Sequence, residues 1–236
     1  MPIKTVLFDF MGTCLDWHSH IVSTLPDEIP EHLRSSFALE WRQAYFDANS
    51  TRLSQGLPPE DIDITHARTW DEVVSREAFT SAQILLSSPQ IKENCIAAWH
   101  HQPAWPDVSS ALSSLRNKGY EIVVHANGTT RLQLDLCQSS GLHFDALFSS
   151  QMLGVYKPAI ESYTRVLELL KREPKECVMV AAHAYDLRGA KAAGTNTVYV
   201  YRWTDDIRED QQVVKEENEV WLEDMRGLVD VIEKLG

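Results

Sequence analysis

Four short motifs along the chain carry side chains that could together form a covalent intermediate with a substrate. Asp9 follows an apolar run at residues 3–8 and precedes the turn residues Gly12-Thr13. Asn127, Lys157 and Asp186 stand in the later motifs. A carboxylate can act as a nucleophile, a lysine can hold and polarise it, and a second carboxylate can assist the later hydrolysis. The sequence therefore predicts an aspartate nucleophile at Asp9, if the fold brings these motifs together.

Each of these motifs, taken alone, also has a simpler explanation. Asp9 could cap a helix, and Asp186 could cap a helix beginning near Leu187. Lys157 could be a surface lysine, and Asn127-Gly128 could be only a turn. The four motifs together, in this order and each after an expected strand, indicate an active site more specifically than any one motif alone.

The elements that would position these motifs alternate between strands and helices. Apolar runs rich in strand formers predict strands, and amphipathic spacing between them predicts helices. Such alternation favours an α/β fold, a doubly wound parallel sheet with helices on both faces. The carboxyl ends of its strands share one rim, where ligands bind. The expected strands are 3–8, 121–125, 146–148, 177–180 and 197–201, and the expected helices are about 107–118, 130–139 and 160–171.

Residues 17 to 103 have a different pattern, with helical spacing and no good strand. We interpret them as a helical domain inserted into a core formed by residues 1–16 and 104–236. The acidic stretch 205–219 is expected to be a solvated loop or helix face. His100-His101, near the exit of the insert, is interpreted as structural.

Bulk properties exclude several other classes of protein. The 236 residues are 44% hydrophobic and 24% charged, which is ordinary for a soluble protein. A formal net charge of −12 argues against general nucleic-acid binding. No apolar run approaches the roughly 18–20 residues that span a bilayer, and no signal peptide is evident, so we expect a cytoplasmic protein without membrane partners. Its four scattered cysteines indicate thiols rather than disulfides or a zinc site.

The motifs resemble those of the haloacid dehalogenase-like superfamily, over nearly the full chain. They occur in the same order, as FDFMGT at 8–13, ANGT at 126–129, YKP at 156–158 and AAHAYDLRGA at 181–190. The insert occupies the place of that superfamily's helical cap. Asp16-Trp-His-Ser19 and Leu39-Glu-Trp-Arg-Gln43 are similar to the 2-haloacid dehalogenase branch. The resemblance implies a Rossmann-like core with an inserted cap.

The resemblance also implies roles for individual side chains. Asp9 would attack the substrate carbon and form an ester, Thr13 would hydrogen-bond near it, and Lys157 would orient it. Asp186 would help to position the hydrolytic water. Arg42 would receive the leaving halide, although it could instead be a surface arginine. We assign substrate binding to Arg42, Asn127, Tyr163, Met11 and Ala126, although Tyr163 could equally be a core aromatic residue.

Two positions bear on metal dependence. Phosphatase members of the superfamily use an aspartate two residues after the nucleophile as acid and base, and a further acidic residue in the fourth motif to hold Mg²⁺. Met11 and Ala182 occupy these positions here. Methionine cannot protonate a leaving group and alanine cannot ligate a metal. We therefore expect no metal, no cofactor and poor phosphatase activity.

Three positions depart from the dehalogenase pattern. Ala126 stands where serine is usual, and Ala181-Ala182-His183 replaces Ser-Ser-Asn. Each alanine lacks the hydroxyl of serine, and losing a hydrogen bond from that hydroxyl to a charged group would cost roughly 1.5–3 kcal/mol. His183 could take a proton from water as a neutral base, or only fill the asparagine volume and bond locally. His125 should point away from Ala126 if the strand alternates, as a core or surface histidine.

The leading expectation is a metal-independent hydrolase that uses Asp9 to displace halide from a 2-haloacid, a small carboxylate-bearing substrate. The family also suggests a homodimer. One rival is a diverged enzyme that performs hydrolysis, elimination or ring chemistry on a larger specialised metabolite. A second rival is a non-catalytic binding protein on the same fold.

Overall fold

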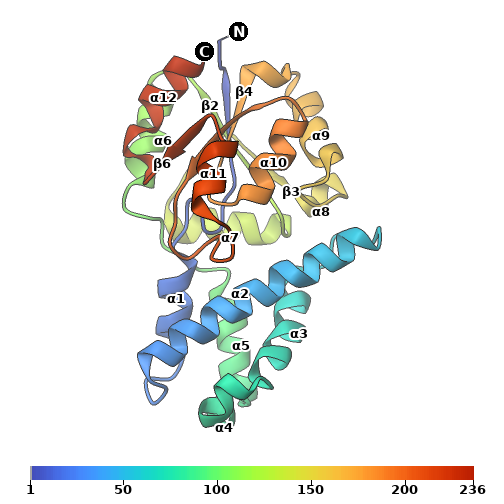
Figure 1. Cartoon of the computed structure of the whole chain (residues 1–236), viewed down its shortest axis with the longest axis vertical. Helices are drawn as coiled ribbons and strands as arrows, with labels where there is room; N and C mark the ends of the chain where they lie inside the picture. Colours follow the sequence, from blue (N-terminus) through green and yellow to red (C-terminus); the bar gives the residue numbers. More distant parts are fainter. Residues whose placement is uncertain (1) are drawn as a thin grey trace.

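A parallel sheet of six strands forms the centre of the molecule (Figure 1). The computed structural model describes residues 2–236. The strand order is β3-β2-β1-β4-β5-β6, so the predicted α/β class and all five predicted strands are confirmed. β6 was not predicted, because its three half-buried residues directly follow the acidic stretch. The strands are β1 (Thr5–Phe8), β2 (Glu121–Ala126), β3 (Ala146–Ser149), β4 (Cys177–Ala181), β5 (Asn196–Val200) and β6 (Val220–Leu222).

Helices cover both faces of the sheet because side chains along each strand alternate between them. On β1, Val6 and Phe8 pack on one face and Leu7 on the other. The first face is covered by α6 (Val108–Asn117), α7 (Thr130–Ser140) and α12 (Leu228–Leu235). The second is covered by α8 (Ser150–Leu153), α9 (Ile160–Leu170), α10 (Ala184–Ala192) and α11 (Gln211–Glu217). Both faces are therefore apolar, as expected for a parallel sheet.

A layer of helices lies beyond one end of the sheet, away from the chain termini (Figure 1). It is packed around aromatic side chains, including Phe37, Trp41 and Trp70. Residues 17–98 contribute no strand to the part of the chain that the structure describes, so this segment is helical as predicted. The division into two domains at residues 17 and 104 stays a prediction. The helices are α1 (Trp17–Thr24), α2 (Glu31–Ser54), α3 (Ile62–Val74), α4 (Gln83–Leu86) and α5 (Pro89–Ala98).

The order of the strands determines where the functional motifs meet. β1 lies between β2 and β4, and Phe8 is level with Val124 and Val180. The next residue, Asp9, donates its backbone N–H to the carbonyl of Val180 over 3.0 Å. Loops that follow β1, β2 and β4 therefore emerge at one rim, at the point where the order of the strands reverses.

Three further features complete the fold. Short 3₁₀ helices occupy Glu77–Ala82, Pro174–Glu176 and Met225–Gly227. None of the four cysteines forms a disulfide. No helix within residues 2–236 has the length and apolar character needed to cross a bilayer.

Candidate active site

Asp9 lies at the end of β1 with both carboxylate oxygens hydrogen-bonded. Its Oδ1 accepts from Lys157 Nζ at 2.9 Å. Its Oδ2 accepts from Thr13 Oγ1 at 2.7 Å and faces His183 Nδ1 at 3.0 Å. Burial alone would raise the pKa of Asp9, but the Lys157 ammonium and the His183 ring lower it well below its usual value. Asp9 is therefore an ionised carboxylate with only 5% of its surface exposed, not a helix cap.

Lys157 is buried, and each of its three ammonium N–H groups has a hydrogen-bond acceptor. It donates to Asp9 Oδ1, to the backbone carbonyl of His125 at 2.8 Å and to Asp186 Oδ2. These contacts use all its donors. Asn127 fixes the backbone of Lys157 from both sides, because its Oδ1 accepts from Lys157 N at 2.8 Å and its Nδ2 donates to Lys157 O at 3.1 Å. The surface-lysine alternative is wrong, and Asn127 is more than a turn residue.

Asp186 and Tyr163 lie behind Lys157. Tyr163 donates its hydroxyl to Asp186 Oδ1 at 2.6 Å, and both side chains are fully buried. Burial and the nearby Asp9 charge raise the pKa of Asp186, although Lys157 opposes this. Helix α10 begins at Ala184, so Asp186 lies in its first turn and does not cap a helix at Leu187. Tyr163 does not line the cavity described below, and its substrate contact stays a prediction.

His183 lies between two buried carboxylates, and the sequence did not indicate the second. Its Nδ1 faces Asp9 Oδ2 and its Nε2 faces Asp205 Oδ1, each at 3.0 Å. Ionised carboxylates only accept hydrogen bonds, so both ring nitrogens must carry protons and the ring is an imidazolium. Burial would lower the pKa of His183, but its hydrogen bonds with Asp205 and Asp9 raise it to about 10. In the resting site His183 is therefore a charged donor and not a neutral base.

Asp205 corrects the prediction that the acidic stretch 205–219 is solvated. Only 3% of its surface is exposed. Its Oδ2 accepts from Thr204 Oγ1 at 2.7 Å and from Trp17 Nε1 at 3.2 Å. Gly12 has a φ of +85°, and a Cβ there would lie 2.4 Å from Asp205 Oδ1, so glycine is required for both reasons. The signal available in the sequence was that Asp205 follows β5, whose end lies at the same rim.

Arg42 lies in α2 and is only 4% exposed, so the surface-arginine alternative is wrong. Its guanidinium lies 4.5 Å from the Phe46 ring centroid and 5.4 Å from that of Tyr45. Its only hydrogen bond in the described residues is a long one, 3.4 Å, from Nη2 to the backbone carbonyl of Met11. Its Nε and Nη1 have no partner there. A buried cation with unused donors is suited to an anionic ligand.

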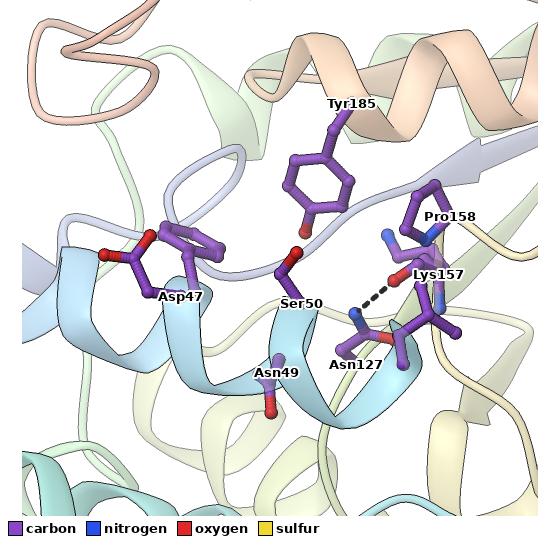
Figure 2. Close-up of a pocket in the computed structure, with 9 residues that line it drawn as sticks. Asp47, Asn49, Ser50, Asn127, Lys157, Pro158 and Tyr185 are labelled. Atoms are coloured by element: carbon purple, nitrogen blue, oxygen red, sulfur yellow. Dashed lines mark hydrogen bonds between the residues drawn. The ribbon is translucent and has the colours of Figure 1, made fainter. Parts of the chain in front are cut away.

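A cavity of about 250 Å³ opens between α2 and the rim of the sheet (Figure 2). Lys157, which donates a hydrogen bond to Asp9, contributes to its wall. The side chains of Ser50 and Tyr185 point toward one another across it in Figure 2. Neither was predicted, because no pattern links a helix of the insert to the core. The lining residues are Phe46, Asp47, Asn49, Ser50, Leu53, Asn127, Lys157, Pro158 and Tyr185.

The three alanines are buried at the rim. Ala182 donates its backbone N–H to Thr13 Oγ1 at 2.9 Å, which leaves the Thr13 hydroxyl proton directed at Asp9. Ala126 ends β2 and Ala181 ends β4, and neither lines the cavity. Met11 is also buried and contacts Arg42 through its backbone carbonyl. Direct substrate contact by Met11 and Ala126 stays a prediction.

The remaining histidines of interest are structural. His125 is fully buried and pairs with Ser162 Oγ at 2.8 Å. His100 joins the helical layer to the core, because its Nε2 lies 3.1 Å from Asp63 of α3 and its Nδ1 lies 2.8 Å from Asp135 of α7. His101 is exposed.

The charge on His183 predicts how stability depends on pH. A raised folded-state pKa means that its stabilisation is fully present below the unfolded value of about 6.5 and is lost as pH rises through about 10. We expect the wild-type unfolding temperature to fall over this window, and to fall less in His183→Asn. Calorimetry against pH would measure both, and parallel curves for the two proteins would contradict the expectation.

Comparison with known proteins identifies the family. Residues 3–194 match the family model described as haloacid dehalogenase-like hydrolase. (S)-2-haloacid dehalogenase 4A of Burkholderia cepacia is 27% identical over 205 residues, 85% of this chain and 84% of the relative. Phosphoglycolate phosphatase of Aquifex aeolicus is 25% identical over 198 residues, 83% of each chain.

The solved structure of the L-2-haloacid dehalogenase PA0810 superposes with a TM-score of 0.80 at 25% identity, over 99% of this chain and 100% of that one. The relatives thus include both dehalogenases and a phosphatase. The family model covers most of the chain, and the aspartate, lysine and second aspartate of its motifs meet at one rim. The protein is a hydrolase that belongs to the haloacid dehalogenase-like family.

Proposed function

We propose that this protein is a metal-independent hydrolase of the 2-haloacid dehalogenase type, with residues 17–103 as its cap. The observation that carries this proposal is the buried guanidinium of Arg42, which contacts the backbone carbonyl of Met11, two residues beyond Asp9. Asp9 is a buried, ionised nucleophile, and Arg42 is a buried cation with unused donors. A substrate carbon with an anionic leaving group would use both. The two relatives named as dehalogenases support this choice.

In the first step an oxygen of Asp9 attacks C2 of the substrate. Oδ2 already contacts Thr13 and His183, whereas Oδ1 contacts only Lys157. Oδ1 therefore has more lone-pair density available and is the proposed nucleophile. A bond forms between Oδ1 and C2 while the carbon–halogen bond breaks, and halide leaves with the bonding electrons. Arg42 receives it, because its guanidinium offers free N–H donors.

In the second step water hydrolyses the ester. The water oxygen adds to Cγ of Asp9, and the bond from Cγ to Oδ1 then breaks. Oδ1 leaves as the oxygen of the 2-hydroxy acid, and the water oxygen stays on Asp9. One water proton goes to the product hydroxyl and the other is released to solvent. Asp186, held by Lys157 and Tyr163, is the proposed group that positions this water.

A divalent metal does not fit the residues present. Met11 and Ala182 offer no side-chain oxygen. Within residues 2–236, no group of three or more His, Cys, Asp or Glu side chains could hold a metal ion. Mg²⁺ requires several oxygen ligands, so no step of the proposed mechanism involves one.

The expected result of metal removal follows from this donor set. Treatment with EDTA should leave halide release unchanged, and added Mg²⁺ should not produce appreciable hydrolysis of p-nitrophenyl phosphate. Both rates can be measured on the same sample. Loss of halide release on chelation, with recovery on adding Mg²⁺, would contradict the expectation.

The proposed function is tested with 2-chloropropionate. We expect halide release and formation of the 2-hydroxy acid. A single turnover in water labelled with heavy oxygen should place the label in the peptide that contains Asp9 and not in the product. The exposed carboxylate of Asp27 provides an internal control, since its peptide should remain unlabelled. Neither halide nor label at high enzyme concentration would overturn the proposal.

The cavity supports one second candidate, a diverged enzyme that acts on a larger substrate. Lys157 has no donor left for a substrate carboxylate, and Ala126 and Ala181 lack the usual hydroxyls. Asn49, Ser50 and Asn127 line the cavity with neutral polar groups. A substrate with a neutral polar group would suit this wall. Halide release from a 2-haloamide but not from 2-chloropropionate would favour this candidate.

A further inference from the structure

We propose that His183, held as an imidazolium by Asp205, forms with Thr13 an oxyanion hole for hydrolysis of the Asp9 ester. This inference rests on the proposed function, because it requires an ester at Asp9. It assigns His183 a direct catalytic role and Asp205 a positioning role.

The geometry at Asp9 directs two donors at one oxygen. Thr13 Oγ1 lies 2.7 Å and His183 Nδ1 lies 3.0 Å from Oδ2, whereas Lys157 contacts Oδ1. If Oδ1 is the nucleophile, Oδ2 becomes the carbonyl oxygen of the ester. Negative charge develops on that oxygen when water adds to Cγ. Donors within hydrogen-bond distance of the developing oxyanion are the geometric requirement for this kind of catalysis.

The electrons and protons of the step balance around this oxygen. Addition of water moves the C=O π electrons onto Oδ2, where the Thr13 hydroxyl and the His183 N–H stabilise them. Collapse returns these electrons to the carbonyl and breaks the bond from Cγ to Oδ1, while one water proton passes to the product oxygen and the other to solvent. His183 carries the same proton before and after, so it needs no proton donor or acceptor.

Asp205 keeps the ring charged when Asp9 cannot. Esterification removes the negative charge of Asp9, which leaves Asp205 as the carboxylate still bonded to the ring, through Nε2. Trp17 and Thr204 hold Asp205 in place, and Gly12 leaves room for it. A buried ion pair is weakened little by solvent, so the charge persists in the ester state.

Two aromatic side chains pack against the His183 ring. The rings of Phe46 and Tyr185 lie with centroids 5.3 Å and 5.6 Å from that of His183. Asp206 binds the backbone N–H of Ala184 and does not contact the ring. The titratable groups beside the His183 ring are Asp9, Asp205, Asp206 and Tyr185. Arg42 and Lys157 act on two of these carboxylates, Asp205 and Asp9.

An oxyanion hole and a general base at His183 predict opposite effects of pH. A charged donor acts only while protonated, so ester hydrolysis should be constant near neutral pH and slow as the ring loses its proton in alkaline solution. A neutral base would instead gain activity as pH rises through its pKa.

The test follows ester on the Asp9 peptide by quenched-flow mass spectrometry after one turnover with 2-chloropropionate. The proteins are wild type, His183→Ala, His183→Asn and Asp205→Asn, with His101→Asn as the matched control at an exposed histidine. His183→Ala removes the donor, so hydrolysis should slow by roughly 100-fold or more and ester should accumulate. His183→Asn retains a neutral donor and should give an intermediate rate without the alkaline decline. His101→Asn should match wild type.

Nitrogen NMR of the histidine rings tests the Asp205 role without any substrate. In wild type both ring nitrogens of His183 should stay protonated well above neutral pH, with the signal assigned by its absence in His183→Asn. Asp205→Asn should move the midpoint of this titration, and the alkaline decline of ester hydrolysis, to lower pH. If Asp205 had only a structural role, Asp205→Asn would change the hydrolysis rate or the folding without moving either midpoint.

Failure of the proposed function and failure of the oxyanion hole give different results. If wild type forms neither halide nor ester, the proposed function fails and this inference fails with it. If wild type forms ester and His183→Ala clears it equally fast, only the inference is overturned. A wild-type hydrolysis rate that rises through neutral pH, or a His183 ring that titrates near its ordinary value, overturns it as well. His183→Asn, whose side chain fits the same volume, replaces His183→Ala if the latter does not fold.

Discussion

Asp9→Asn is expected to abolish turnover, with a fall in kcat on the order of 10⁵–10⁶, the scale on which loss of a nucleophile acts. The amide has nearly the same shape as the carboxylate, but it lacks the charge and cannot displace halide. Steady-state halide release and mass spectrometry of the Asp9 peptide would measure the effect. No ester should form on the variant.

The control for Asp9→Asn is the same exchange at an exposed aspartate. Asp27→Asn removes a carboxylate that is 95% exposed and pairs only with Arg34, so it should retain full activity. Appreciable turnover by Asp9→Asn, after spontaneous deamidation has been excluded by mass, would refute the covalent mechanism.

Lys157→Met is expected to cause the largest loss of stability, about 3–5 kcal/mol in the free energy of unfolding. The ammonium lies between the buried carboxylates of Asp9 and Asp186, and methionine fills a similar volume without charge. Two buried carboxylates would then face one another with less compensation, and activity should also be lost. Urea unfolding followed by circular dichroism would give the change.

The pH dependence of the stability of Lys157→Met distinguishes repulsion between buried carboxylates from simple loss of packing. Protonation of Asp9 and Asp186 relieves the repulsion between them. The difference in the free energy of unfolding between Lys157→Met and wild type should therefore become smaller as pH falls. Lys118→Met serves as the control, because Lys118 forms an exposed pair with Glu233 and its replacement should change stability little. If Lys157→Met lowers the free energy of unfolding by less than about 1 kcal/mol at neutral pH, uncompensated buried charge is not the cause of the loss.

The local balance of charge explains how an acidic chain keeps the Asp9 carboxylate buried and ionised. The net charge of −12 resides mainly on the surface, whereas Asp9, Asp186 and Asp205 are matched locally by Lys157, His183 and Arg42. Each buried carboxylate has at least one cation within direct contact or close range. His183 in turn is balanced by two carboxylates, Asp9 and Asp205.

The positions of Asp9, Lys157 and Asp186 could be predicted from the sequence because their signals are local. Each follows an apolar strand at a turn or helix start, and parallel strands bring such ends to one rim. The same pattern predicted the sheet and the helical insert. β6 escaped prediction because it contributes only three residues after a charged stretch.

The partners of these groups could not be predicted, because they come from distant parts of the chain. Asp205 contacts Trp17 from 188 residues away, and Arg42 reaches Met11 from a helix outside the core. Tyr163 supports Asp186 instead of lining the cavity, and α2 supplies much of the cavity wall. Such contacts depend on which helices pack together, and no periodicity in the chain encodes that. Local sequence patterns predicted where Asp9 lies, whereas burial and long-range pairing set its charge, its neighbours and the residues that line the cavity.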